Sequence, residues 1–375
     1  MRTVDVLVIG GGIAGVSAAC ELAAHREVCL VERESMLSAH STGRSAATFV
    51  LALGAPGVRA LTRASAATMT RPPDIFTSPL LSPRPTLWFC GAEDLAAGER
   101  FRAEVATPEV EVLTPAEAHR ACPILRTENV ALAMWDPTGS DVDVAALHAG
   151  YLRGLLARGG TVHRDWRVAA LERDSTMWTV RAASGDVVRA PVVVNAAGAW
   201  SDEVAGLARV RPAGLTPLRR TVFLSPSDAF PPRREWPTLA SLGGLFYLKP
   251  EGREFLCSPI DATPEAPGDP KPDEPRIAKA IEDINTWTRL GLRHVRRSWA
   301  GQRTYAADGL PVVGFDPVAE GFFWLSGQGG FGIQTAPAMA GLTRDLIVPG
   351  EVSPALAAAG VHAETYSPER LASGA

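Results

Sequence analysis

Several features that point to particular classes of protein are scarce or absent in this sequence. The 375 residues include only five cysteines, which are scattered and never spaced as Cys-x-x-Cys, so neither a disulfide framework nor a zinc site is indicated. No two of the seven histidines have metal-ligand spacing, and we expect no bound metal. The formal net charge of −4 offers no basic surface to nucleic acid, which is therefore not an expected partner.

Long apolar runs are also missing. No uninterrupted stretch approaches the roughly eighteen residues of a membrane span, so no transmembrane segment is expected. The first apolar strand begins almost at Met1, which leaves no room for a secretion signal, and we expect a cytoplasmic protein. A chain of this length can bury a sizeable core, as two domains or as one large composite.

Glycine carries the most informative pattern, close to the N-terminus. An apolar strand runs into Gly10-x-Gly12-x-x-Gly15, a helix is expected over 13–24, and a second apolar strand ends at Glu32. In a βαβ unit the first glycine permits a tight turn, the second leaves space for a pyrophosphate, and the third lets the helix pack closely on the strand. The acidic residue accepts hydrogen bonds from a ribose. The unit predicts a dinucleotide site, and both NAD and FAD use such a unit.

A second glycine-rich loop, over 327–335, lies between an expected strand at 322–326 and an expected helix at 335–347. Backbone N–H groups and the positive end of a helix at such a loop can face an anion. A flavin has a use for this, because its reduction leaves negative charge on the ring, whereas an NAD enzyme would leave the loop unexplained. The alternative is an ordinary loop that joins a strand to a helix.

Further motifs lie between these two loops. They are Ser41-Thr42-Gly43-Arg44-Ser45, the stretch Val194 to Trp200, and Arg303 followed by Asp308 to Gly314. Together with both glycine loops they resemble the D-amino-acid oxidase family of FAD enzymes, which includes glycine oxidase and sarcosine oxidase. Within this family the chain is most similar to the bacterial D-arginine dehydrogenase type. The resemblance extends in order over essentially the whole chain.

The resemblance implies an α/β (α+β composite) fold. A Rossmann-like FAD-binding domain would be built from 1–50, 140–215 and 300–375. A substrate-binding domain with a mixed sheet would be built from 51–139 and 216–299. The sarcosine oxidases attach their flavin through a cysteine near the late glycine loop, and this chain has none there, so we expect non-covalent FAD.

The resemblance also implies positions for the cofactor. The ADP portion would be held by the N-terminal fingerprint and Glu32, the 41–45 segment would follow the pyrophosphate toward the ring, Val168 would meet the adenine, and the late loop would border the flavin. The implied cofactor-binding residues are Gly10, Gly12, Ile13, Ala14, Gly15, Glu32, Arg33, Ser41, Thr42, Gly43, Arg44, Ser45, Ala46, Ala47, Val168, Ala197, Gly198, Trp200, Gly329, Gly330, Phe331, Gly332, Ile333 and Gln334.

The family pattern implies that Arg220 and Arg303 bind a substrate carboxylate with the Tyr247 hydroxyl, and that the Gly330 carbonyl accepts from the substrate amine. A guanidinium matches a carboxylate with two charge-assisted hydrogen bonds. Arg219 and Arg220 are adjacent on an expected strand and point to opposite faces, so only one reaches this ligand, and we expect Arg220. The alternatives are a solvated charge for either arginine and an ordinary strand aromatic for Tyr247.

The substrate side chain would be surrounded by Thr48, Val50, Leu53, Thr86, Thr238, Ala240 and Gly244. The D-arginine type places a carboxylate here, and the apparently matching position in this chain is Thr86. An unpaired buried guanidinium costs several kcal/mol, which disfavours D-arginine as the substrate. We therefore expect a D-amino acid with a neutral or apolar side chain.

The expected reaction is hydride transfer from the substrate Cα to flavin N5, which leaves an imine that hydrolyses to a 2-oxo acid and ammonia. Oxygen, a quinone or another carrier would accept the electrons. One alternative is oxidation of N-methyl or cyclic amino acids, as in the sarcosine and glycine oxidases. The other is a flavin-bound subunit without turnover of its own.

Overall fold

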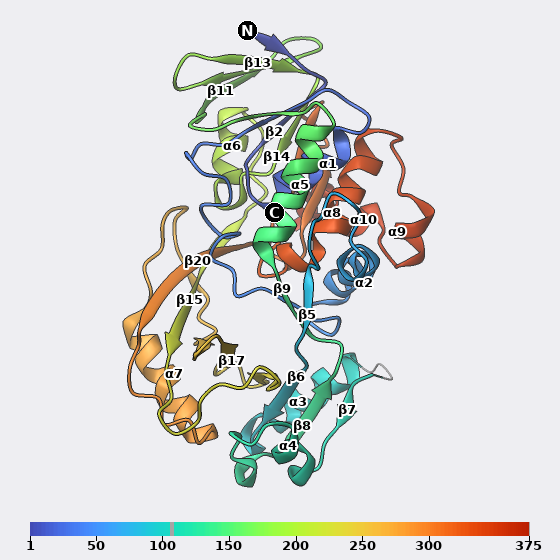
Figure 1. Ribbon diagram of the computed structural model, residues 1–375. Coiled ribbons are helices and arrows are strands. Elements are labelled where there is room, and N and C mark those ends of the chain that lie inside the picture. Colours follow the sequence, from blue (N-terminus) through green and yellow to red (C-terminus); the bar gives the residue numbers. More distant parts are fainter. Residues whose placement is uncertain (106–108, 375) are drawn as a thin grey trace.

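The computed structural model describes residues 1–105 and 109–374, which form an upper and a lower part joined at a narrower middle (Figure 1). In the upper part the central sheet has six strands. Their order is β10 (Thr161–His163), β3 (Val28–Val31), β2 (Val6–Ile9), β14 (Val192–Asn195), β22 (Phe322–Ser326) and β21 (Val312–Phe315). All neighbours run parallel except β21, which is antiparallel to β22. The strands β2, β3 and β14 consist almost entirely of apolar residues, because both faces of a parallel sheet are covered by other elements.

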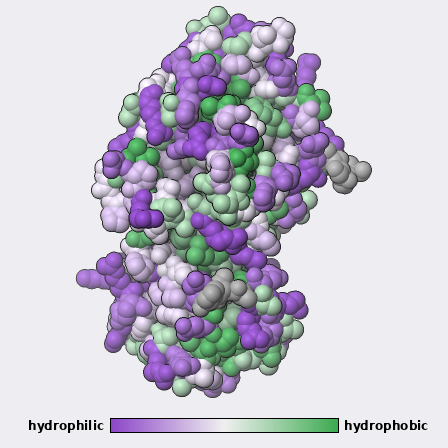
Figure 2. All heavy atoms as spheres, turned by 90° about the vertical axis from the view of Figure 1, so that its right-hand side faces the viewer, coloured by the Kyte–Doolittle hydropathy of each residue, from purple (hydrophilic) through white to green (hydrophobic). Residues whose placement is uncertain are grey.

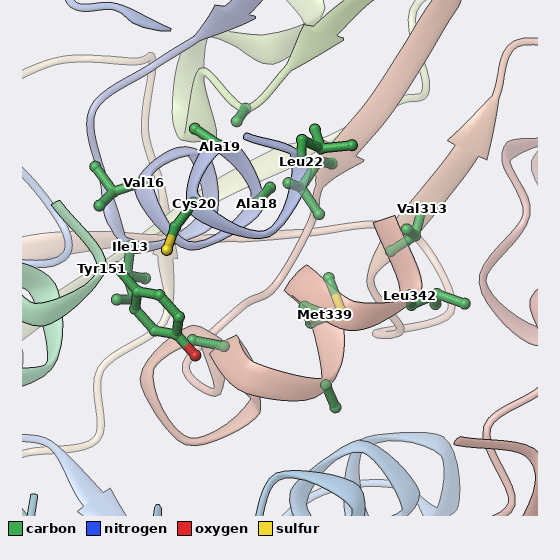
Figure 3. Packing of buried hydrophobic residues seen from close by; sticks show 14 of the residues in the cluster. Ile13, Val16, Ala18, Ala19, Cys20, Leu22, Tyr151, Val313, Met339 and Leu342 are labelled. Atoms are coloured by element: carbon green, nitrogen blue, oxygen red, sulfur yellow. The ribbon is translucent and has the colours of Figure 1, made fainter. Parts of the chain in front are cut away.

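Helices cover one face of this sheet. They are α1 (Ile13–Leu22), α2 (Pro56–Thr70), α5 (Val144–Ala157) and α8 (Gly332–Ile347). Val16 and Cys20 of α1 pack against Tyr151 of α5 and Met339 of α8, with Leu342 further along α8 (Figure 3). Burial of such side chains contributes about 1.5–3 kcal/mol each for the larger ones, so this cluster holds the fingerprint helix in place.

The opposite face is covered by a four-stranded sheet and a short helix. The sheet consists of β1 (Arg2–Thr3), β13 (Val187–Ala190), β12 (Trp178–Ala182) and β11 (Val168–Arg173), and the helix is α6 (Ser201–Leu207). Strands β11 to β13 form an antiparallel meander. The helix expected from 335 begins earlier, at Gly332. Glycine is a weak helix former, so the sequence alone does not indicate this start.

The lower part contains a nine-stranded mixed sheet. Its strands are β19 (Thr263–Pro264), β15 (Thr216–Ser225), β18 (Glu254–Ser258), β17 (Tyr247–Glu251), β16 (Thr238–Ser241), β6 (Thr86–Cys90), β8 (Leu132–Asp136) and β7 (Glu111–Val112), with β20 (Arg297–Tyr305) paired to β15. Helices α7 (Glu274–Trp287) and α4 (Pro115–Ala121) cover one face, and α3 (Leu95–Glu104) lies beside β6. The other face of the sheet contributes Val222, Leu256 and Trp299 to a cluster with Ala46.

A small sheet lies where the two parts meet. It consists of β4 (Thr48–Phe49), β9 (Ser140–Val142) and β5 (Leu81–Pro83), and the Asp143 side chain after β9 caps α5 by accepting from Ala146 N at 2.8 Å. The C-terminal tail forms α9 (Pro354–Ala358), α10 (Ala363–Tyr366) and a 3₁₀ turn (Pro368–Gly374). Tyr366 is buried there and donates to the Gly57 carbonyl at 2.8 Å, which fastens the tail to α2.

Hydrophilic residues cover most of the face shown in Figure 2, and hydrophobic residues lie scattered among them. Among the helices of the described residues, none is both long and apolar enough to cross a membrane.

Candidate active site

A cavity of about 520 Å³ extends from the ends of β2, β3, β14 and β22 to the β15–β20 pair. It brings together both glycine loops, which begin at Gly10 and Gly327 and lie more than 300 positions apart in the sequence. Most of the cofactor residues expected from the sequence line it. They are Gly10, Gly12, Ile13, Ala14, Glu32, Arg33, Ser41, Thr42, Arg44, Ser45, Val168, Ala197, Gly198, Trp200, Gly329, Gly330, Gly332 and Ile333.

The three fingerprint glycines have different surroundings. Gly10 has a φ of +115° and a Cβ there would lie 2.4 Å from the Ala196 carbonyl oxygen, while a Cβ on Gly15 would lie 1.9 Å from the Gly10 carbonyl oxygen. Gly10 is therefore needed for its positive φ and its contact with the chain after β14, and Gly15 for the close packing of α1 on the turn after β2. Gly15 does not line the cavity. A Cβ on Gly12 would meet only Thr42 Oγ1, at 3.3 Å, and would project into the cavity. Gly12 thus keeps open a cradle next to the α1 N-terminus.

Backbone hydrogen bonds orient the carboxylate at the end of β3. Glu32 Oε2 accepts from Gly11 N at 2.7 Å, and Oε1 accepts from Glu34 N at 2.9 Å. The carboxylate is buried at the cavity wall and retains further acceptor capacity there. Nearby, the Arg33 guanidinium lies 4.8 Å from the centre of the Trp200 ring, and the His40 ring lies 4.6 Å from the same ring. This end of the cavity combines a ribose acceptor with flat aromatic surface.

The 41–45 segment connects the α1 N-terminus to β20. Thr42 Oγ1 accepts from Ile13 N at 3.0 Å, and the Ser41 hydroxyl donates to the Gln302 carbonyl at 2.5 Å. The Arg44 guanidinium donates to the Ala300 carbonyl at 3.1 Å, and Trp299 Nε1 donates to the Arg44 carbonyl at 3.1 Å. Gly43, Ala46 and Ala47 do not line the cavity.

The second glycine loop presents donors to the same cavity. The N–H groups of Gly332 and Ile333 lie in the first turn of α8, where an α-helix offers them no partner of its own. The Gln328 side chain lines the cavity, and its buried Nε2 lacks a partner among the described residues. Phe331 and Gln334 do not line the cavity, and the Gln334 amide instead binds Val50 N at 3.3 Å and Thr62 Oγ1 at 2.9 Å.

These features fit FAD. The cradle at Gly12, the oriented Glu32, the helix N-termini at both loops and the unpartnered Gln328 amide face one elongated cavity. The residues that would hold the ADP portion lie at one end, and those that would border the ring lie at the other.

Two arginines stand at the ring end. Arg220 faces Gly301 across the β15–β20 pair, and Arg303 lies two residues further along β20, so both side chains are on the same face. Arg220 Nε donates to the Asp261 carbonyl at 2.6 Å, and no hydrogen bond or ion pair of Arg303 is found among the described residues. Burial, and secondly the charge of Arg303, lower the pKa of Arg220 to about 10, which leaves it charged at neutral pH. An anion is the natural partner for these free N–H groups.

Arg219 has different surroundings on the opposite face of β15. Its guanidinium lies 2.7 Å from Glu265, 2.6 Å from Asp273 and 3.5 Å from Asp261. These acidic residues pair with its charge, whereas Arg220 lines the cavity. The prediction that the two side chains separate is in line with this arrangement.

The residues expected around the substrate side chain do not line this cavity. Val50, Leu53 and Ala240 belong instead to one apolar cluster with Ala52, Trp88, Cys90, Leu132 and Met134. Tyr247, expected to bind the substrate carboxylate, packs against the same cluster and does not line the cavity either. Thr86 and Thr238 face each other in register on β6 and β16, and the hydroxyl of each is buried without a partner among the described residues. Thr48 lies on β4, opposite Asp141. Gly244 lies in the exposed turn between β16 and β17, with a φ of +73°.

Sequence reasoning missed residues of β20 that contribute to the site. Gln302 lines the cavity and holds the loop before α7, accepting from Gly268 N at 3.0 Å and donating to the Ala266 carbonyl at 2.7 Å. Tyr305 accepts from Gly330 N at 3.1 Å. For Tyr305 the available signal was alternation along the strand, because Gly301, Arg303 and Tyr305 share one face, whereas no such signal marks Gln302.

His148 is a buried residue of α5 that lies against the fingerprint loop, with Nε2 2.9 Å from the Gly11 carbonyl oxygen. Burial lowers its pKa below the ordinary value. The folded protein therefore binds fewer protons at this group than the unfolded chain, and its unfolding free energy should fall as the pH drops below about 6.5.

We expect His148→Gln, which keeps a donor but does not titrate, to have a shallower loss of stability between pH 7 and pH 5 than wild type. Urea unfolding at several pH values measures this slope. His362→Gln, at an exposed position, serves as the control and should retain the wild-type slope. Equal slopes for wild type and His148→Gln would refute this assignment.

Comparisons with known proteins agree with this geometry. The model of the FAD dependent oxidoreductase family matches residues 5–346. The chain is 26% identical to FAD-dependent oxidoreductase domain-containing protein 1 of Bos taurus, covering 92% of this chain and 81% of that protein. It is also 26% identical to glycine oxidase of Geobacillus kaustophilus, covering 92% of each. The solved structure of L-proline dehydrogenase from P. horikoshii has the same fold, with a TM-score of 0.85, 20% identity, and coverage of 100% of this chain and 99% of that chain.

Proposed function

This chain belongs to the FAD dependent oxidoreductase family, the family of the D-amino-acid oxidases, and on that premise we propose that it oxidises the Cα–N bond of a D-amino acid with a neutral or apolar side chain. The pair of arginines at the ring end of the cavity carries this proposal. Their free N–H groups and net positive charge suit a carboxylate, which would hold one end of a small amino acid.

The residues of the chain would orient the substrate and bind its charged groups. Arg220 and Arg303 would bind the carboxylate with the Tyr247 hydroxyl, and the Gly330 carbonyl would accept from the amine. A Cβ on Gly330 would lie 2.7 Å from Arg303 Nη1, so the expected amine acceptor and one carboxylate-binding group are adjacent. Two fixed contacts on neighbouring substituents of Cα set the direction of its C–H bond.

FAD, when bound, supplies the acceptor for the hydride that leaves Cα. With the loss of that hydride and of one amine proton, the substrate becomes an imine, which water hydrolyses to a 2-oxo acid and ammonia. The amine enters the reaction neutral, because its nitrogen lone pair must stabilise the cation that forms as the hydride leaves Cα. Oxygen, a quinone or another carrier would finally take the two electrons.

The residues expected around the substrate side chain lie outside the cavity lining, and the neutral class rests on Thr86, which stands where the D-arginine type has a carboxylate. One carboxylate lies near this region: Asp136 pairs in register with Thr86 and is buried. Its Oδ1 accepts from Thr138 N at 2.9 Å and from Thr138 Oγ1 at 2.6 Å, while Oδ2 lacks a partner among the described residues. Because Thr138 already binds this carboxylate, we retain the neutral class, and basic substrates provide its test.

Anaerobic reduction of the purified holoenzyme tests the proposal. The panel contains D-alanine, D-leucine, D-methionine, D-arginine and D-lysine, the corresponding L-amino acids, sarcosine, glycine and proline. We expect the neutral D-amino acids to bleach the flavin absorbance fastest, with formation of ammonia and a 2-oxo acid.

Other outcomes have distinct meanings. Faster reduction by D-arginine or D-lysine would refute the neutral class and implicate Asp136. Faster reduction by sarcosine, glycine or proline would favour the alternative of N-methyl or cyclic amino acids, in agreement with the glycine oxidase relative. A bound flavin that no amine reduces would refute the proposed oxidation and favour a subunit without turnover.

A further inference from the structure

Tyr305, the last residue of β20, lies directly against the second glycine loop. Its backbone bridges to Gln328, and Gly329 N donates to the neighbouring Thr304 carbonyl at 2.8 Å. The Tyr305 hydroxyl accepts from Gly330 N at 3.1 Å. Strand and loop are therefore joined by both backbone and side chain.

The ring of Tyr305 packs on the loop so closely that only glycine fits opposite it. A Cβ on Gly329 would lie 2.2 Å from Tyr305 Cε1. On the next residue, a Cβ on Gly330 would lie 2.7 Å from Arg303 Nη1. Gly329 thus packs against the tyrosine ring, and Gly330 packs against the Arg303 guanidinium. Gly330 therefore connects the Tyr305 hydroxyl to Arg303, one of the two arginines expected to bind the substrate carboxylate.

Such a loop needs external anchors to hold one conformation. Glycines at 327, 329, 330 and 332 restrict their backbone torsions little. On the C-terminal side of Gly330, Phe331 N donates to the Gln328 carbonyl at 3.0 Å and orients that peptide group. On its N-terminal side the N–H of Gly330 is held by Tyr305, so a side chain outside the loop completes the restraint.

We propose that Tyr305 is a positioning residue whose hydroxyl holds Gly330 so that the Gly330 carbonyl accepts from the substrate amine while Arg303 binds the carboxylate. This inference rests on the proposed function. It assigns a specific task to the hydroxyl, distinct from the packing of the ring. It also separates Tyr305 from Tyr247, which is expected to contact the substrate itself.

Tyr305→Phe in the holoenzyme tests the inference, because it keeps the ring and removes the hydroxyl. The rate of flavin reduction at saturating substrate should fall about tenfold for the best D-amino acid, as expected for a lost hydrogen bond that positions a reacting group. The Kd for acetate, a carboxylate without an amine, should change less than twofold when followed by the flavin absorbance. Flavin content and thermal stability should match wild type.

Tyr151→Phe is the matched control, since it makes the same change in the buried core cluster and should leave the reduction rate unchanged. An unchanged rate in Tyr305→Phe would overturn the inference. If the Kd for acetate rose by the same factor as the reduction rate fell, the hydroxyl would act on the bound carboxylate, and the inference would be overturned as well. A lower flavin content or a lower thermal stability of Tyr305→Phe would mean that Tyr305 serves packing alone, and would also overturn the inference. A wild-type flavin that no amine reduces refutes the proposed function instead, and it does so before any variant is compared.

Discussion

Arg303→Met is expected to lower kcat/KM for the amine substrate about thirtyfold to several thousandfold without reducing the FAD content. Removal of one partner from a charge-assisted pair in a partly buried site costs about 2–5 kcal/mol, and each 1.4 kcal/mol corresponds to about tenfold. Arg303 has no other hydrogen bond or ion pair among the residues that the structure describes, so its loss should disturb the fold little.

Arg220 can still bind the substrate carboxylate in this variant, so the activity should fall rather than vanish. Arg220 stays in the cavity, and the variant lacks the charge of Arg303 that lowers the pKa of Arg220 in the wild type. Arg303→Lys should recover only part of the loss, because an ammonium cannot bind both carboxylate oxygens in the planar arrangement of a guanidinium. Steady-state kinetics with the best substrate of the panel measures both variants.

The control for this experiment is Arg293→Met, which removes the same charge from an exposed position before β20. It should leave kcat/KM unchanged. If kcat/KM of Arg303→Met stayed within about fivefold of the wild-type value, Arg303 would not bind the substrate carboxylate. Loss of flavin in that variant would show that Arg303 supports the cofactor instead.

Gly12→Ala is expected to yield a folded protein with little bound flavin. The new Cβ would meet only Thr42 Oγ1, at 3.3 Å, but it would project into the cavity where the pyrophosphate is expected. Displacement of that group from the α1 N-terminus weakens hydrogen bonds to a charged partner, which contribute about 1.5–3 kcal/mol each. The FAD affinity should therefore fall about tenfold to a few hundredfold, as measured by flavin titration of the apoprotein.

Two other glycine variants separate binding from folding. Gly15→Ala places a Cβ 1.9 Å from the Gly10 carbonyl oxygen and should lower the unfolding free energy by at least about 1–3 kcal/mol, because α1 must move away from β2. Gly206→Ala, in α6, meets no atom within 4 Å and should raise stability by about 1 kcal/mol without an effect on flavin. Wild-type FAD affinity in Gly12→Ala would refute the role of this cradle.

The sequence was most informative where short-range geometry dictates the residue type. The turn at Gly10, the close contact at Gly15 and the acidic end of β3 are local requirements of one βαβ unit, and all are present. Alternation on β15 separated Arg219 from Arg220 for the same reason. The acidic residues that pair with Arg219 are Asp261, Glu265 and Asp273, which lie more than forty positions further along the chain, and no local pattern in the sequence predicts this pairing.

Other parts of the site depend on long-range pairing. Tyr305 meets Gly330 because β20 ends beside the loop that follows β22, and Gln302 meets the 41–45 segment because β20 crosses toward the upper part (Figure 1). The buried Asp136 faces Thr86 only through the register of β6 and β8. A single sequence does not encode such a register visibly, because many pairings satisfy the same alternation.

By itself, the sequence determined that the chain holds a dinucleotide at an N-terminal βαβ unit, and its family motifs identified FAD as the cofactor. These conclusions rest on local backbone geometry, which a few glycines and one acid specify. Only the tertiary structure decided which acidic residues pair with Arg219, that Arg303 on β20 lacks a counter-ion among the described residues, and which tyrosine holds the second glycine loop. The reason is physical: charge pairing and burial depend on what folding brings near each group, and those partners lie far away along the chain.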